Sequence, residues 1–434
     1  MKVFIKNKIA INAGWIVLCK IIQAVLNLIV TMIMARNLGP SNYGLINYAI
    51  SVVTFFVPIM QLGLNSTLVN EFVINPDDEG KIIGTSFVLS SISSIFCIIG
   101  IYGFSIIANK SEKQTTIVCL LYSTQLFFYG LEMIQYWFQS KLYSKYTSIV
   151  MLIAYAIVAI YKVYTILFLK SIYMLALAET VNYCIISLVL IIIYKSLNGK
   201  KIVPSLKQAK KLFSRSRYYI VSTMMVMIFN QTDKVMLKLM ANDAATGYYS
   251  AGVTCATMTS FVFVAIIDSF RPTIFEAKLK SQTLFENRMT SLYTIIIYFS
   301  LLQSLAITLL AKPIIYIMYG KKYFNSINAL RIIVWFTTFS YLGTVRNIWI
   351  LAEEHQKYMW VINFSGALAN VIINYILIPP FGIIGASVAS LITQVFTNVI
   401  IGYIIKPIRQ NNHLMIRALN LSNFYKNLKD LYNT

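Results

Sequence analysis

The chain has 434 residues, of which 58% are apolar and only 12% are charged, and its mean hydropathy is +0.69. Soluble domains carry about 25% charged residues, so this composition excludes a soluble globular fold. The net charge is +22, but the excess lies in short loops between apolar runs and no nucleic-acid-binding pattern is present, which excludes a nucleic-acid partner.

The apolar runs have the length of membrane helices. The first follows a basic start and continues past Val30 without a signal-peptidase pattern, so we expect a membrane span there and not a cleaved signal. At about 20 apolar residues per span, the sequence predicts an all-α polytopic membrane protein. Twelve transmembrane helices are expected, at 11–33, 43–65, 81–107, 115–138, 147–169, 172–195, 218–241, 247–271, 290–311, 327–351, 357–379 and 383–406.

A basic segment divides these spans into two sets of six. Lys195 to Arg217 holds eight basic residues and no acid, so it cannot enter hydrocarbon and is expected on the cytoplasmic side. We therefore predict two six-helix lobes around a central cavity. The expected divisions are a first lobe at 1–195, a linker at 196–217, a second lobe at 218–406 and a cytoplasmic tail at 407–434.

The distribution of Lys and Arg predicts the orientation. With both termini and the linker in the cytoplasm, about 24 of the 37 basic residues lie on the cytoplasmic side and about eight on the other. The sequence thus indicates a multi-pass membrane protein with both termini in the cytoplasm. One loop, Asn75–Lys81, is net acidic on the cytoplasmic side, and its Asp77, Asp78 and Glu79 are expected to be solvated.

The loops leave little room for an enzyme. None reaches the roughly 50 residues that a soluble catalytic domain needs, and His355 and His413 stand alone without zinc-ligand spacing. The five cysteines all lie in apolar runs without a CxxC pair, as expected for buried packing. We predict no metal, no cofactor and no enzymatic activity.

Charges inside the spans are the candidate functional residues, because a charge at membrane depth is costly and usually faces a bundle interior or a hydrated cavity. Five cations from both lobes are expected to line a passage that suits an anionic cargo such as a pyrophosphate: Lys20, Lys162, Lys234, Arg331 and Arg346. Four acids are candidates for coupling or gating: Asp233, Asp268, Glu179 and Glu132.

Each candidate also has a purely structural interpretation. Lys162, Asp268, Arg331 and Arg346 lie near span ends, where a long side chain can extend to the headgroups. Glu132 and Glu179 can each hydrogen-bond within one lobe. Lys20 lies about 13 Å into the first span, near the middle of the membrane. At that depth its side chain cannot easily extend to the headgroups.

Several strings resemble the polysaccharide-export branch of the multidrug/oligosaccharidyl-lipid/polysaccharide exporter superfamily, and the resemblance covers nearly the whole chain. They are Arg36–Leu45 (RNLGPSNYGL), Gln231–Lys238 (QTDKVMLK), Thr246–Val253 (TGYYSAGV), Tyr319–Ile327 (YGKKYFNSI) and Asn374–Leu391 (NYILIPPFGIIGASVASL).

This resemblance implies a flippase. Two lobes would open alternately to each face and carry an undecaprenyl-pyrophosphate-linked oligosaccharide to the outer leaflet for O-antigen or capsule synthesis. Membrane lipids, a polysaccharide polymerase and a chain-length regulator are the implied partners. Two alternatives stay open: an ion-coupled multidrug exporter, which would use the acids, and a lipid II flippase, which usually carries two further spans.

Overall fold

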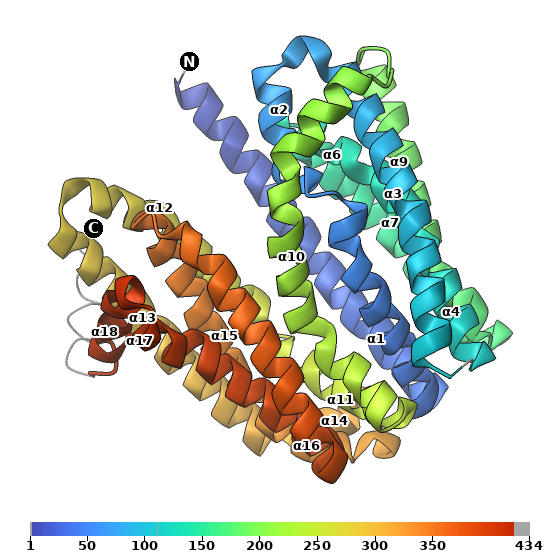
Figure 1. Cartoon of the computed structure of the whole chain (residues 1–434), viewed down its shortest axis with the longest axis vertical. Helices are drawn as coiled ribbons and strands as arrows, with labels where there is room; N and C mark the ends of the chain where they lie inside the picture. Colours follow the sequence, from blue (N-terminus) through green and yellow to red (C-terminus); the bar gives the residue numbers. More distant parts are fainter. Residues whose placement is uncertain (1, 111, 421–434) are drawn as a thin grey trace. The chain divides into compact units, whose positions relative to one another are not determined.

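The computed structural model describes residues 2–110 and 112–420, with side chains from residue 15 onwards except that of residue 17. Among these residues the regular structure is helical and there is no β-strand, which confirms the all-α class (Figure 1). Residues 421–434 of the expected tail lie outside the described part of the chain.

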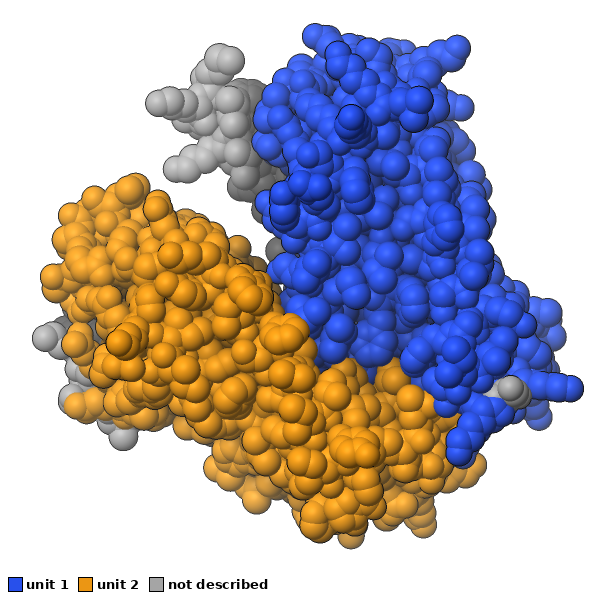
Figure 2. Space-filling model, viewed as in Figure 1, with its two compact units in different colours: residues 1–231 blue, residues 232–434 orange. Residues whose placement is uncertain are grey.

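Contacts divide the chain into two compact units, residues 1–231 and 232–434, which Figure 2 shows in blue and orange. The boundary falls inside one helix, α10. The helices that belong to the first unit or begin in it are α1 (Lys2–Met60), α2 (Leu68–Ile74), α3 (Glu79–Ala108), α4 (Lys113–Ser123), α5 (Gln125–Leu131), α6 (Gln135–Ser140), α7 (Ser144–Tyr164), α8 (Ile172–Ala176), α9 (Ala178–Ser196) and α10 (Leu206–Met240).

The second unit continues from α10. Its helices are α11 (Asp243–Thr257), α12 (Ser260–Lys280), α13 (Gln282–Leu309), α14 (Ala311–Tyr319), α15 (Ser326–Ala352), α16 (Met359–Val395), α17 (Ile401–Ile404) and α18 (Arg409–Arg417). Helix α18, from the expected tail, packs on α13, where Tyr293 donates a 2.8 Å hydrogen bond to Asn411 Oδ1. Part of that tail is therefore folded onto the second unit.

Two very long helices are sharply bent at a glycine. Helix α1 breaks at Gly39 (φ 73°) and α16 at Gly382 (φ 52°), in a backbone region that glycine adopts at little cost. Prolines adjoin both breaks and remove helix hydrogen bonds. Each break lies between two spans predicted from hydropathy, and each arm carries one of them.

Seven helical segments of the described chain are long and apolar enough to cross a membrane, or up to eight if the bent pair α11–α12 is one span. Two of the seven contain a glycine break, and the longer, Gln356–Ile404, has 49 residues. At about 1.5 Å per residue this length exceeds twice the roughly 30 Å thickness of the hydrocarbon core. The protein is a multi-pass membrane protein, and the number twelve stays a prediction.

The acidic loop before α3 differs from its prediction, because Glu79 is buried and not solvated. Its carboxylate accepts from Trp137 Nε1 at 2.8 Å and from the backbone N–H of Lys200 at 3.2 Å, and it lies 3.6 Å from Lys141 Nζ. Asp77, by contrast, is fully exposed at its side chain and pairs with Lys200 at 2.9 Å. The dense positive charge of the linker explains why acids occur here.

A second buried acid, Glu71 on α2, holds the next part of the linker. It forms ion pairs with Lys211, at 3.0 Å, and with Arg215, both from the first turns of α10. The predicted basic linker is thus mostly helical and is fixed to the first unit by two buried glutamates, Glu71 on α2 and Glu79 at the start of α3.

The linker backbone lies directly on a glycine face of α3. A Cβ at Gly84 would come within 2.6 Å of the Val203 carbonyl carbon and 2.9 Å of Pro204 N. Because those atoms are backbone, they cannot move aside cheaply. We expect Gly84→Ala to lower the free energy of unfolding by about 1–3 kcal/mol through overpacking, measured by thermal unfolding of the purified protein.

Gly103 on the same helix is the matched control, because nothing lies within 4 Å of a Cβ built there. Gly103→Ala should be neutral or should stabilise the helix by up to about 1 kcal/mol. Equal unfolding temperatures for the Gly84 and Gly103 variants would show that the linker does not pack on α3 as described.

Candidate functional site

One carboxylate in the second unit is buried without a salt-bridge partner among the described residues. Asp233, near the C-terminal end of α10, is 8% exposed, and four side chains donate hydrogen bonds to it. Asn370 and Asn374 reach Oδ1 at 2.9 and 2.6 Å, and Tyr249 and Ser390 both reach Oδ2 at 2.6 Å. Such short charge-assisted bonds stabilise the ionised carboxylate in place of water.

The bend in α16 brings these donors together. Asn370 and Asn374 are four residues apart and share a helix face before the bend, whereas Ser390 comes from the arm after it. The arms approach closely, because a Cβ at Gly385 would lie 2.0 Å from the Leu377 carbonyl oxygen. The part of α16 after the bend therefore packs tightly against the part before it.

The cluster is rich in oxygen atoms. The side-chain oxygens of Asn370 and Asn374 are buried without a described hydrogen-bond partner, and the hydroxyls of Tyr249 and Ser390 lie 2.8 Å apart. Carboxylate, amide and hydroxyl oxygens are ligands that hard cations prefer. Chemically, this arrangement can take up a proton or a small monovalent cation. No group of three or more His, Cys, Asp or Glu residues suited to a metal occurs among the described residues.

Four members of this cluster were not singled out from the sequence, although signals for them exist. Tyr249, Asn374 and Ser390 each lie in one of the family-like strings, and Asp233 lies in a third. The string that holds Asn374 and Ser390 lies more than 100 residues from the other two in the chain, yet side chains from all three meet at one carboxylate. Asn370 has a weaker signal, its spacing of four residues from Asn374 in an apolar run.

The structure joins two predicted site residues in the first unit. Lys162 on α7 forms an ion pair with Glu179 on α9 at 2.5 Å, and both side chains are less than a fifth exposed. Asn182 adds a 3.4 Å hydrogen bond to the same carboxylate. Lys162 lies seven residues before the end of the predicted span 147–169 and Glu179 seven residues after the start of the next, 172–195, so the sequence places both at a similar depth.

The other predicted acids lie elsewhere. Glu132 is buried in the first unit and accepts a hydrogen bond from Gln135 at 3.1 Å. Asp268 on α12 is exposed and pairs with Arg271 at 3.0 Å. Neither joins the Asp233 cluster.

The remaining cations differ in exposure. Lys20 on α1 and Arg331 on α15 are exposed, and neither forms an ion pair with a described residue. Lys234 is half-buried beside Asp233 in the chain. Arg346, also on α15, is 4% exposed and donates a 2.6 Å hydrogen bond to the Thr397 carbonyl. Thr397 belongs to a π-helical turn, Phe396–Ile400, so Arg346 is held inside the second unit.

Comparisons with known proteins bear on the family and on the fold. The model of a family described as polysaccharide biosynthesis protein matches residues 9–278. An uncharacterised membrane protein of Methanocaldococcus jannaschii is 27% identical over 233 residues, 50% of this chain and 45% of that protein. The chain thus matches less than half the length of this relative.

Solved structures of transporters share the fold. An inward-closed lipid II flippase MurJ has a TM-score of 0.68 at 15% identity and covers 96% of this chain and 92% of its own. An inward-facing multidrug resistance MATE family transporter of the MOP superfamily has a TM-score of 0.66 at 14% identity, with 92% and 96% covered. At such identities the likeness concerns the fold alone.

Proposed function

Because the chain belongs to the polysaccharide biosynthesis protein family, whose model spans more than half of it, we propose that it is a lipid-linked oligosaccharide flippase. Its cargo would be an undecaprenyl-pyrophosphate-linked repeat unit. The protein would turn this unit from the cytoplasmic to the outer leaflet of the bacterial inner membrane by alternating access, for O-antigen or capsule synthesis. The family match is the observation that carries this proposal.

A polar cargo needs a polar path across the membrane. A sugar headgroup cannot cross hydrocarbon unaided, so a hydrated groove must replace its water while the polyprenyl tail stays in lipid. Fixed cations would balance the pyrophosphate charge along the way. Of the five predicted cations, Lys20 and Arg331 are exposed and lack an acidic partner among the described residues, so their charges are the most available to a cargo.

Lys20 gives the direct test of this charge argument. We expect Lys20→Ala to reduce surface polysaccharide at least tenfold when the variant complements a strain in which the gene is deleted. The reason is that a pyrophosphate would lose a charge-assisted contact worth about 1.5–3 kcal/mol. Surface polysaccharide is measured with a specific antibody, and protein level by immunoblot.

Lys113→Ala is the control, because Lys113 is exposed at the first turn of α4, outside the predicted spans. It should complement fully. Full complementation by Lys20→Ala, at equal protein level, would show that the charge of Lys20 is not needed for transport.

We further propose that the Asp233 cluster couples transport to a proton or sodium gradient. Support comes from its burial, its four donors and its two unpartnered amide oxygens. The same cluster would suit an ion-coupled multidrug exporter, the second candidate. A drug-susceptibility screen of the deletion strain separates the two, since only the exporter predicts sensitisation with intact surface polysaccharide.

A further inference from the structure

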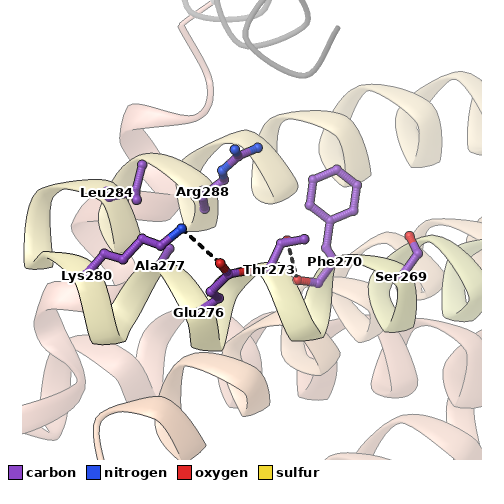
Figure 3. A pocket seen from close by; sticks show the side chains of 8 residues that line it. All are labelled: Ser269, Phe270, Thr273, Glu276, Ala277, Lys280, Leu284 and Arg288. Carbon is purple, nitrogen blue, oxygen red and sulfur yellow. Dashed lines mark hydrogen bonds and ion pairs between the residues drawn. The ribbon is translucent and has the colours of Figure 1, made fainter. Parts of the chain in front are cut away.

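A groove between α12 and α13 lies outside the Asp233 cluster and has a volume of about 450 Å³. It occupies the polar end of the hairpin that these helices form, on the side predicted to be cytoplasmic. Figure 3 shows Arg288 from α13 and Phe270 from α12 pointing the same way, with Glu276 and Thr273 along α12. The lining residues are Ser269, Phe270, Thr273, Glu276, Ala277, Lys280, Leu284 and Arg288.

Arg288 differs from the other cations at this end of the hairpin. Arg271 pairs with Asp268, Lys278 with Glu353 and Lys280 with Glu276, at 2.6–3.0 Å. Arg288 is half-buried, yet within the described chain it forms no ion pair or hydrogen bond. Its five N–H donors are therefore available in the groove, in the planar arrangement that binds phosphate oxygens two at a time.

The opposite wall offers acceptors. Ser269 and Thr273 donate their hydroxyl protons to backbone carbonyls of their own helix, at 2.7 and 2.8 Å, which leaves their oxygens free to accept. A hydrogen bond and the charge of Lys280 hold the pKa of Glu276 below its usual range, and Arg288 adds a smaller effect. Glu276 therefore stays an ionised acceptor near neutral pH.

These groups together match a sugar that carries a phosphate. Free guanidinium donors suit the phosphate, acceptor oxygens suit sugar hydroxyls, and the Phe270 ring offers an apolar face for a sugar ring. A volume of about 450 Å³ is within the usual range for small-molecule sites. A phosphatidylcholine headgroup, which has no hydrogen-bond donor, would leave the acceptors on α12 without partners.

We propose that the α12–α13 groove is a binding site for a sugar phosphate, with Arg288 holding the phosphate and Phe270, Thr273 and Glu276 the sugar. The sugar phosphate can be soluble or can be the headgroup of a prenyl-linked sugar in the membrane. Only the second source rests on the proposed function.

The test uses the full-length protein in phosphatidylcholine nanodiscs and measures binding of labelled N-acetylglucosamine 1-phosphate by equilibrium dialysis. Arg288→Gln should weaken binding roughly tenfold to hundredfold, the usual cost of losing hydrogen bonds to a charged group. Arg288→Lys keeps the positive charge but loses the planar set of guanidinium donors, so its affinity should lie between those of wild type and Arg288→Gln. Arg271→Gln is the matched control on the same hairpin and should bind within twofold of wild type.

Three results would overturn the site: wild-type affinity in Arg288→Gln, an equal loss in Arg271→Gln, or equally tight binding of unphosphorylated N-acetylglucosamine. Thermal unfolding of each variant shows that it is folded. A prenyl-phosphate-linked sugar added to the nanodiscs should displace the soluble probe if the lipid-borne source is correct, and failure to displace it assigns the groove to soluble sugar phosphates.

The outcome is separable from the proposed function. Arg288-dependent binding in a protein that does not flip lipid-linked sugars would overturn only the flippase. Normal flipping with no Arg288-dependent binding would overturn only the groove.

Discussion

Asp233→Asn is expected to abolish gradient-driven transport while most of the fold survives. The amide is nearly isosteric with the carboxylate, but it cannot carry the charge and turns an NH2 group toward the donors on α16 (Asn370 and Asn374). Asp233→Ala should be worse for stability, because all four donors would lose this acceptor and the Asn370 amide has no other acceptor among the described residues, at a cost of about 1–3 kcal/mol. Transport is measured by flipping of a fluorescent prenyl-linked sugar in proteoliposomes.

The decisive measurement is ion dependence. In wild type, an imposed sodium or proton gradient should change the flipping rate, and in Asp233→Asn this response should vanish. Asp268→Asn is the control, since Asp268 is exposed and pairs only with Arg271 three residues away. If Asp233→Asn keeps a gradient-dependent rate, the buried cluster is structural and coupling resides elsewhere.

Glu79→Leu should release the basic linker from the first unit. In the wild type, Trp137 Nε1 and the Lys200 backbone N–H donate to the Glu79 carboxylate at 2.8 and 3.2 Å. The leucine would leave both donors without this acceptor. Breaking a buried charge network in this way costs about 3–5 kcal/mol. We expect a lower unfolding temperature and faster tryptic cleavage after Lys200 and Lys201, which Glu79 and α3 now hold in place.

Asp77→Asn provides the comparison, because Asp77 also contacts Lys200 but its side chain is fully exposed. Exposed ion pairs contribute about 0–1 kcal/mol, so this variant should unfold and digest like wild type. Similar behaviour of the two variants would mean that burial of Glu79 does not anchor the linker.

Most of the fold could be predicted from local pattern. Hydropathy over about 20 residues located helices, and the gaps expected between spans at 34–42 and 380–382 are the places where α1 and α16 bend, at Gly39 and Gly382. The similar depth of Lys162 and Glu179 also follows from their positions in the predicted spans, because the rise per residue is constant in a helix.

The partners of the buried charges were not predictable in the same way. Asp233 stood out as a charge in a span, but its donors are neutral residues more than 130 positions away on α16, together with Tyr249. Nothing local distinguishes such residues from ordinary helix-packing ones. Glu79 was misjudged for a related reason: its sequence neighbours are acidic and exposed, and only the fold places it under Trp137.

The bent helix α16 also has a mechanical consequence. Asn374, before the bend, and Ser390, after it, both donate hydrogen bonds to the Asp233 carboxylate. The two halves of α16 therefore cannot separate without breaking one of these bonds. If an ion binds at Asp233 as proposed above, its binding and the hinge angle are coupled, and by thermodynamic reciprocity a force that opens the hinge changes the affinity for that ion. The proposed site would in this way convert a chemical potential into a movement of helices.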